Sequence, residues 1–319
     1  MISVNELAKK LLSLKNVALF CHVRPDGDAL GSACALKRAL VLSGVKTEIF
    51  CEDVMPERFS FLIENGEVKN VCGGVSGFDA FIAVDCADAS RLGAFADVFT
   101  SHKNTFNIDH HVSNTRYARE NYVVEKPANA INVYHVIRAM GVNIDEKTAN
   151  LLALGLTTDT GGFRHKNVSP EAFEIAGILC GLGADFNAIS YNMFTLQSKE
   201  RAKLFGTVMS KIRYELGGRL AFITVTLEDL AKTGAKPDET EGFIDFIMGI
   251  SGVEVGVSLL ETSKDNFKVS FRSCGTDVNG VASTFGGGGH TLASGCRINL
   301  PYEETVDRVT FAVGRYIKD

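Results

Sequence analysis

The segment FCHVRPDGDALGS, residues 20–32, decides the fold prediction for this chain. The run VALFC at residues 17–21 is short, apolar and uninterrupted, which is typical of a buried strand in a parallel sheet. Residues 29–42 place apolar and small side chains at helical spacing. The residues between them are therefore predicted to form a strand-to-helix turn at the carboxyl edge of a sheet, where α/β folds place their ligand sites.

Three side chains in this turn could bind a cation, namely His22, Asp26 and Asp28. Two carboxylates and one imidazole suit Mn²⁺, Mg²⁺, Fe²⁺ or Zn²⁺. A purely structural alternative exists, because Pro-Asp-Gly-Asp is a good turn by itself and Asp28 could cap a helix that begins at Ala29. The choice depends on whether further candidate ligands meet at the same edge.

The composition limits the class of protein. A chain of 319 residues with 45% hydrophobic and 22% charged residues is long enough for two globular domains, each with its own core. No apolar run reaches the length of a membrane span, no signal-peptide pattern is seen, and the eight cysteines contain no Cys-x-x-Cys pair. We therefore expect a cytoplasmic protein without membrane association. The net charge of −5 argues against binding long duplex nucleic acid through a broad basic face, but it leaves short anionic ligands open.

Further strands and helices alternate along the first half of the chain. Residues 45–51, 78–85 and 105–108 read as strands, whereas residues 129–140 and 146–156 read as helices. This alternation predicts an α/β fold with a doubly wound parallel sheet.

Candidate ligands recur at the ends of these elements. Asp85 ends the most apolar predicted strand, and the next strand runs into Asp109, His110 and His111. A single Asp is common in structural loops, but two adjacent histidines in such a place favour chemistry. Asp159 follows an apolar helix, where burial of an unpaired carboxylate would be costly, so a nearby cation would explain it.

The chain is predicted to divide into two domains joined by a helical linker. The predicted ranges are 1–190, 191–217 for the linker and 218–319. In the last range, residues 254–262 and 267–272 read as paired strands.

Four consecutive glycines, Gly286–Gly289, precede His290 in the second domain. Glycines allow backbone conformations that other residues avoid, and successive free N–H groups would form a nest for an anion. The alternative is a flexible loop. Because His290 flanks the glycines and Arg272 ends a nearby predicted strand, phosphate binding is the preferred interpretation.

Together, these motifs resemble the DHH phosphoesterase family and its companion DHHA1 domain, and they look most like the nano-RNase (oligoribonuclease)/pAp phosphatases. The resemblance implies an N-terminal doubly wound DHH domain, a smaller C-terminal α/β DHHA1 domain and an active site in the cleft between them. It also implies hydrolysis of short oligoribonucleotides and dephosphorylation of 3′-phosphoadenosine 5′-phosphate (pAp).

The resemblance further implies a centre of two divalent metal ions, Mn²⁺ before Mg²⁺, Co²⁺ or Fe²⁺. Its ligands would be His22, Asp26 and Asp85 for one ion, and Asp28, Asp85, His110 and Asp159 for the other. His111 would contact the scissile phosphate or protonate the leaving oxygen, with Asp109 orienting a histidine. The rest of the nucleotide would bind to Arg272, Gly287, Gly288, Gly289 and His290.

Two other functions stay open at this point. One is hydrolysis of linear dinucleotides derived from cyclic dinucleotides, such as pApA and pGpG. The other is a non-catalytic nucleotide-binding module, which the complete set of candidate ligands disfavours. A homodimer is also left open.

Overall fold

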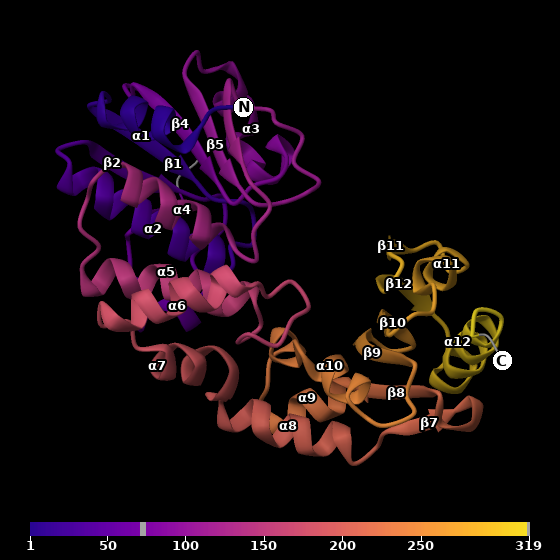
Figure 1. Ribbon diagram of the computed structural model, residues 1–319. Helices are drawn as coiled ribbons and strands as arrows, with labels where there is room; N and C mark the ends of the chain where they lie inside the picture. The colour runs from indigo at the N-terminus through magenta and orange to yellow at the C-terminus, as the bar shows by residue number, and fades with distance from the viewer. Residues whose placement is uncertain (71–74, 318–319) are drawn as a thin grey trace. The chain divides into compact units, whose positions relative to one another are not determined.

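The computed structural model describes residues 1–70 and 75–317. The chain divides into two compact units, Met1–Leu196 and Gln197–Asp319, which Figure 1 colours from indigo to yellow along the sequence. The boundary between them falls at Leu196 and Gln197. The interpretation of residues 191–217 as a linker stays a prediction, although α8 (Lys199–Met209) packs Leu204 and Val208 into a core of the second unit.

The first unit contains a six-stranded parallel sheet with the order β3-β2-β1-β4-β5-β6, as the α/β prediction requires. From β1 the chain builds outward to β3, then crosses back to place β4 on the other side of β1. The order therefore reverses between β1 and β4, and in doubly wound sheets such a switch point opens a ligand-binding crevice. The strands are β1 Asn16–Phe20, β2 Lys46–Phe50, β3 Val68–Lys69, β4 Ala80–Val84, β5 Thr105–Asp109 and β6 Glu120–Val123.

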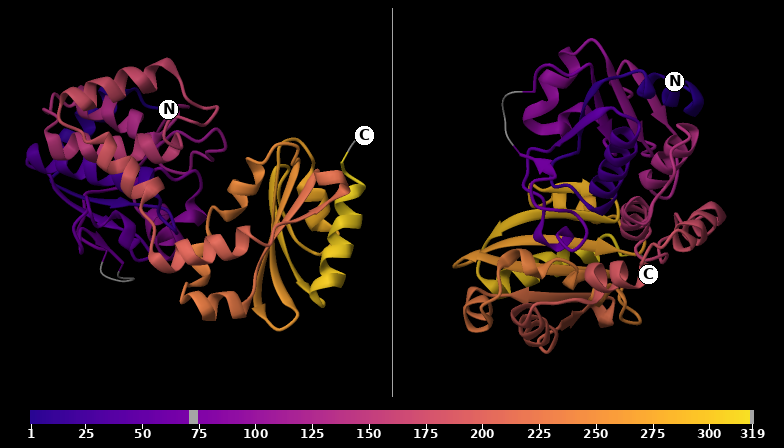
Figure 2. Two further views of the ribbon diagram at one scale, coloured as in Figure 1. Left: turned by 90° about the horizontal axis from the view of Figure 1, so that it is seen from below. Right: turned by 90° about the vertical axis from the view of Figure 1, so that its left-hand side faces the viewer.

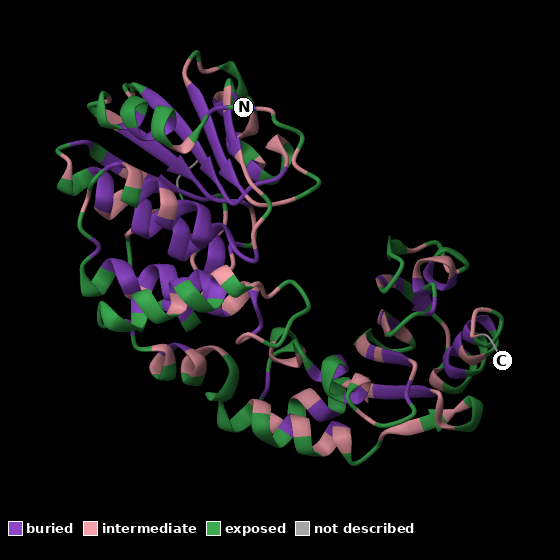
Figure 3. Cartoon of the chain, viewed as in Figure 1, coloured by how far each residue is buried: buried purple, intermediate pink, exposed green. Residues whose placement is uncertain are grey.

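Helices pack on the sheet because its central strands are buried along their whole length, as Figure 3 shows in purple. One large core includes residues of α1, α2, α4 and α5, and a smaller, phenylalanine-rich core contains Phe20, Phe81 and Phe99. The helices are α1 Val4–Leu12, α2 Gly27–Leu42, α3 Ala96–Ser101, α4 Asn129–Ala139, α5 Glu146–Asp159, α6 Pro170–Gly181 and α7 Phe186–Ser190. They are joined by short helical turns at Glu57–Phe59, Ala89–Phe95 and Tyr191–Thr195.

Helix α2 begins two residues earlier than expected. Its N-cap is Asp26, whose Oδ1 accepts the backbone N–H groups of Asp28 and Ala29, both at 3.0 Å. The alternative in which Asp28 caps a helix starting at Ala29 is therefore wrong, because Asp26 already satisfies those N–H groups. The Asp28 side chain is left for another partner.

The second unit contains a mixed six-stranded sheet with the order β11-β12-β10-β9-β8-β7, in which β9 and β10 pair antiparallel as predicted. Helix α12 covers one face of this sheet, and α8, α9 and α10 lie on the other (Figure 2). The elements are β7 Arg213–Glu215, β8 Leu220–Val225, α9 Leu227–Thr233, α10 Phe243–Met248, β9 Val255–Ser263, β10 Asn266–Ser273, α11 Val278–Ser283, β11 Gly288–His290, β12 Ala293–Asn299 and α12 Tyr302–Gly314, with short turns at Leu216–Gly218 and Pro237–Thr240.

Within residues 1–70 and 75–317, no single helix is both long enough and apolar enough to cross a membrane. The segments Pro170–Gly181 and Phe186–Thr195 meet these criteria only as a pair, and they are bent by 118° relative to each other.

Candidate metal centre

The predicted ligands of the first unit gather at the carboxyl edge of its sheet. His22 follows β1, Asp85 follows β4, and Asp109 ends β5, with β4 lying between the other two strands. Asp28 comes from the first turn of α2, and Asp159 is the last residue of α5. Neighbouring parallel strands end at the same edge, so side chains distant in sequence converge there.

Donor atoms within 4.8 Å of one another form three overlapping sets, which together contain every first-domain candidate. Asp85 belongs to two of the sets and so does His110, so the sets form one continuous cluster. The sets are Asp85, Asp109, His110 and His111; His22, Asp26 and Asp85; and Asp28, His110 and Asp159.

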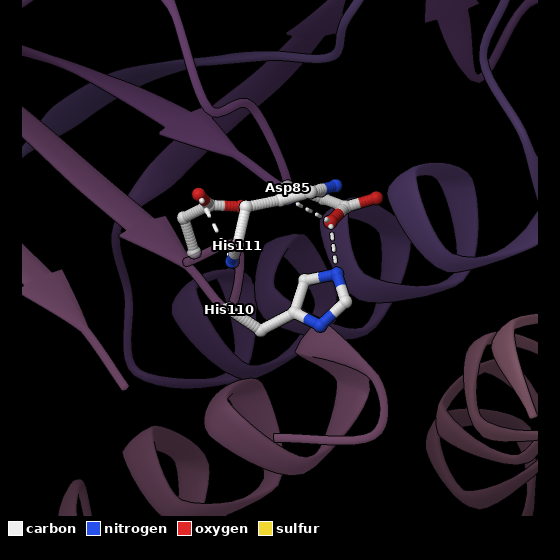
Figure 4. Close-up of side chains that lie close together, drawn as sticks. Asp85, His110 and His111 are labelled. Atoms are coloured by element: carbon white, nitrogen blue, oxygen red, sulfur yellow. Dashed lines mark hydrogen bonds and ion pairs between the residues drawn. The ribbon is translucent and has the colours of Figure 1, made fainter. Parts of the chain in front are cut away.

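Asp85 lies at the centre of this cluster and is 2% exposed. Its Oδ1 is 3.2 Å from His110 Nε2 and 3.7 Å from His111 Nδ1 (Figure 4). No hydrogen bond of acceptable geometry reaches this buried oxygen from the described residues. Asp85 also has φ +57°, a strained conformation for a residue other than glycine. A buried acceptor left unsatisfied costs about 1–3 kcal/mol, which a bound cation would offset.

Burial raises the pKa values of three carboxyl groups in the cluster. Burial and the nearby Asp28 carboxylate raise the pKa of Asp85 well above its usual range. Burial also raises the pKa of Asp28, and burial together with the Asp28 charge raises the pKa of Asp159 to about 8. Like charges this close cannot all ionise in a dry site, so the cluster requires positive charge to hold its carboxylates deprotonated.

His22 presents one ring nitrogen to the cluster. Its Nδ1 is 2.9 Å from the Val23 carbonyl oxygen, and its Nε2 faces the cluster, 3.6 Å from Asp26 Oδ2 and 3.8 Å from Asp85 Oδ2. Burial raises the pKa of Asp26, but the His22 contact outweighs it and lowers this pKa to about 2. Arg91, which no sequence motif singled out, places Nη2 3.0 Å from His22 Nδ1 and brings a positive charge to the edge of the cluster.

His110 is oriented in the same way. Its Nδ1 lies 2.9 Å from the Lys126 carbonyl oxygen, so Nε2 faces Asp85 and lies 3.5 Å from Asp159 Oδ2. Burial lowers the pKa of His110, but the adjoining Asp85 and Asp28 carboxylates raise it to about 10. In the absence of a cation, a proton on His110 supplies part of the missing positive charge.

His111 is held by Asp109, whose Oδ1 lies 2.9 Å from His111 Nδ1. Asn114 Nδ2 donates to Asp109 Oδ2 at 2.6 Å and to Asn107 Oδ1 at 2.7 Å. Burial raises the pKa of Asp109, but these contacts from His111 and Asn114 lower it below its ordinary value. Sequence reasoning missed both asparagines, because neither a polar residue inside a strand, such as Asn107 in β5, nor a turn-forming residue after it, such as Asn114, carries a signal of a side-chain network.

The candidate residues of the second unit also share one surface. Arg272 on β10 is directly opposite Ala293 on β12, which is directly opposite His290 on β11. Directly opposite residues in antiparallel strands point to the same face of the sheet. Arg272 and His290 therefore lie on one face, with only the small Ala293 side chain between them.

The predicted anion nest is wrong for the first two glycines. The N–H of Gly286 donates to the Ser283 carbonyl and that of Gly287 donates to the Ala282 carbonyl, each closing the turn after α11. A Cβ on Gly287 would overlap the Gly295 carbonyl oxygen, so this glycine permits close packing of two chain segments. Gly288 and Gly289 lie in β11, an edge strand, rather than in a free loop.

Comparison with known proteins agrees with this arrangement. Residues 16–156 match the DHH family, N-terminal domain, and residues 217–319 match the DHHA1 domain. The chain is 33% identical to the bifunctional oligoribonuclease and PAP phosphatase NrnA of Thermus thermophilus over 92% of this chain and 87% of that protein. It is 27% identical to the protein of the same name from Bacillus subtilis, over 92% of each chain.

A solved structure supports the fold in particular. An exopolyphosphatase-related protein from Bacteroides fragilis superimposes with a TM-score of 0.87 at 24% identity, covering 98% of this chain and 96% of that one. The two family models match one unit each, and the two relatives match over most of the chain. The chain belongs to the DHH family, with an N-terminal DHH domain followed by a DHHA1 domain.

Proposed function

We propose that the chain is a metal-dependent phosphoesterase that hydrolyses short oligoribonucleotides to mononucleotides and dephosphorylates pAp. The names of its relatives, bifunctional oligoribonuclease and PAP phosphatase, support this substrate class. The observation that carries the proposal is the buried Asp85 carboxylate, whose Oδ1 accepts no hydrogen bond of acceptable geometry from the described residues and lies among imidazole nitrogens and carboxylates.

The donor set fits two divalent cations. His22, Asp26 and Asp85, which form one donor set, would hold one. Asp28, His110 and Asp159, which form another, would hold the second ion together with Asp85, which shares a further donor set with His110. Carboxylate oxygens with imidazole nitrogens suit Mn²⁺, and also Mg²⁺, Co²⁺ or Fe²⁺. Such ions, when bound, supply Lewis-acid stabilisation of the charge that develops on a phosphoryl group.

The remaining side chains bind substrate and move a proton. The ring of His111, fixed through Nδ1 by Asp109, turns its other nitrogen away to contact the scissile phosphate or protonate the leaving oxygen. In the second unit, Arg272 and His290 contact a phosphate of the nucleotide, and the Arg guanidinium binds it through two N–H groups. Gly288 and Gly289 on the edge strand β11 let the backbone approach that nucleotide closely, whereas Gly287 supports them by packing against Gly295.

The test measures Mn²⁺-dependent product release from pAp and from a 5′-labelled RNA dinucleotide. Asp85→Asn is the informative variant, because Asn keeps the shape of Asp and tolerates a positive φ better than Ala does. We expect wild type to act on both substrates and the variant to lose about 100-fold or more in kcat/KM, the effect of removing a group at the reacting centre. Asp97→Asn on exposed α3 is the control and should keep full activity.

Wild-type turnover of neither substrate, with metal bound, would contradict the proposal. Turnover of pApA or pGpG by such a preparation would instead support the dinucleotide alternative.

A further inference from the structure

Three rows of side chains cross one face of the second sheet. They lie on the same side because opposite residues of antiparallel strands share a face, and they follow the described register of β10, β12 and β11. The rows, each written from β10 outward, are Arg272, Ala293 and His290; Ser270, Gly295 and Gly288; and Lys268 and Arg297.

The third row places two positive charges directly opposite each other. Lys268 and Arg297 are paired in register, and both side chains are exposed. Within residues 1–70 and 75–317, neither has an acidic partner within 4.0 Å, and the next residue of the row, Leu260 on β9, is uncharged. Like charges directly opposite in a sheet are destabilising, so the stability of the sheet does not explain this pair.

The middle row consists of small residues and separates the two cationic rows. It forms a flat surface between them, here called the floor. Ser270, Gly295 and Gly288 together offer one hydroxyl group and no bulk. Lys268 is four residues from Arg272 on the same strand, so the two positions are about 13 Å apart. A chain of nucleotides that lies across the floor can place one phosphate at each row.

We propose that Lys268 and Arg297 form a second phosphate site, which binds a phosphodiester of an oligoribonucleotide beyond the phosphate at Arg272 and His290. This inference rests on the proposed function and extends it to substrate length. The two phosphates of pAp are carried by one nucleoside: one is the phosphate that is hydrolysed, the other is available to Arg272 and His290, and none is left for the third row. A longer oligonucleotide has a further phosphate to place there.

The experiment compares two substrates in one variant, Lys268→Ala with Arg297→Ala. We expect KM for a 5′-labelled RNA pentanucleotide to rise by roughly 5- to 20-fold, the effect of losing a charge-assisted contact at an exposed site, while KM for pAp stays unchanged. The slope of log KM against log salt concentration should fall by about 0.7 for the pentanucleotide, as for one lost phosphate contact on a single strand.

A matched control removes the same charge elsewhere in the second unit. Lys203→Ala with Arg315→Ala takes two exposed cations from α8 and from the C-cap of α12, and it should change neither substrate's KM. The Lys268→Ala, Arg297→Ala variant should melt no lower than wild type, because the facing repulsion is gone. Lys268→Gln with Arg297→Gln removes the charge and keeps most of the side-chain length, in case alanine disturbs the strands.

The possible outcomes distinguish failure of the proposed function from failure of the second phosphate site. Wild type that turns over neither substrate contradicts the proposed function itself. Wild type that turns over both, with a variant that changes both KM values alike or neither, overturns the second phosphate site. Alanine and glutamine variants that both melt lower would show that the pair serves the fold, and the site would again be overturned.

Discussion

The Asp28 carboxylate accepts the backbone N–H of Asn129 at 2.5 Å, so a side chain of α2 satisfies the first turn of α4. Its other oxygen accepts the N–H of Ala130 at 2.9 Å and the hydroxyl of Ser32 at 3.0 Å. A helix N-terminus stabilises negative charge. The contact therefore fixes the position of one candidate metal ligand from an element about one hundred residues away.

The position of the Asp28 carboxylate depends on a glycine at position 155 of α5, because a side chain there would occupy the same space. A Cβ there would lie 2.5 Å from Asp28 Oδ1 and 2.9 Å from Ala130 Cβ. We expect Gly155→Ala to lower the free energy of unfolding by about 1–3 kcal/mol through overpacking and to weaken Mn²⁺ binding by roughly 10-fold or more. Calorimetric titration and thermal denaturation measure both.

Gly177→Ala on α6 is the matched control, since a Cβ there meets no atom of the described residues within 4 Å. It should leave Mn²⁺ affinity unchanged and raise stability by up to about 1 kcal/mol, the helix propensity difference. Equal Mn²⁺ affinity in the Gly155→Ala variant would contradict the argument.

Metal-free protein should lose stability as pH rises. The pKa of Asp159 is about 8 in the folded state against an ordinary 3.8, so the folded state binds more protons between these values and stability falls across them. The pKa of His110 is about 10 against 6.5, so its contribution is full below pH 6.5 and is lost towards pH 10. The lowered pKa of Asp26 acts in the opposite direction, but only below about pH 4.

Melting temperatures of chelator-treated protein between pH 5 and pH 9 check this expectation. The temperature should decrease with pH, added Mn²⁺ should raise it most at high pH, and Asp159→Asn should flatten the metal-free profile. A metal-free profile that rises over this range would show that the cluster is not the dominant titrating element.

Asn114 is expected to position His111 through Asp109. Asn114→Asp removes the Nδ2 group that donates to Asp109 and Asn107. It keeps an oxygen in place of Asn114 Oδ1, which accepts the Arg116 backbone N–H at 2.7 Å. We expect kcat to fall roughly 10- to 100-fold with little change in KM. In a His111→Ala background the same change should lower kcat hardly any further, because the side chain that Asn114 positions is already absent.

Asn104→Asp is the control for this change, since Asn104 lies at the other end of β5 and donates from Nδ2 to the Asp79 carbonyl at 3.1 Å. Independent, additive losses from Asn114→Asp and His111→Ala would argue for a separate role of Asn114.

Gly287→Ala should disturb the edge of the second sheet. The new Cβ would overlap the Gly295 carbonyl oxygen and Cys296 Cβ, which displaces β11 and with it His290. We expect a loss of about 1–3 kcal/mol of stability and a higher KM for both substrates. Gly275→Ala, where the part of the chain that the structure describes leaves 4 Å of open space around the added Cβ, should be neutral in both assays.

Local patterns were enough to predict the elements that carry the candidate metal centre. His22, Asp85 and Asp109 each follow an apolar strand within a residue or two, and parallel strands end at a common edge. The sequence therefore predicted which side chains converge. It did not predict the partner of Asp28, because the N-terminus of α4 reaches that carboxylate only through the packing of α2, α4 and α5.

The register of the strands in the second sheet could not be predicted from the sequence either. The facing of Lys268 and Arg297 depends on how β10 pairs with β12, and a shift by one residue would send one of them to the opposite face. The glycine segment was misjudged for a related reason. Its first amides close a turn and its later residues join an edge strand, which four identical residues in a row cannot reveal.

Each compact unit closes hydrophobic cores of its own, those of the first unit around its parallel sheet and those of the second on the two faces of its mixed sheet. Natural selection can therefore act on the two halves at different rates. The first unit, with its strained and crowded carboxylates, tolerates little change. Exposed residues such as Lys268 and Arg297 can be substituted without disturbing any of the hydrophobic cores. New substrate ranges in such a lineage should arise first by substitutions on the open strands of the second half.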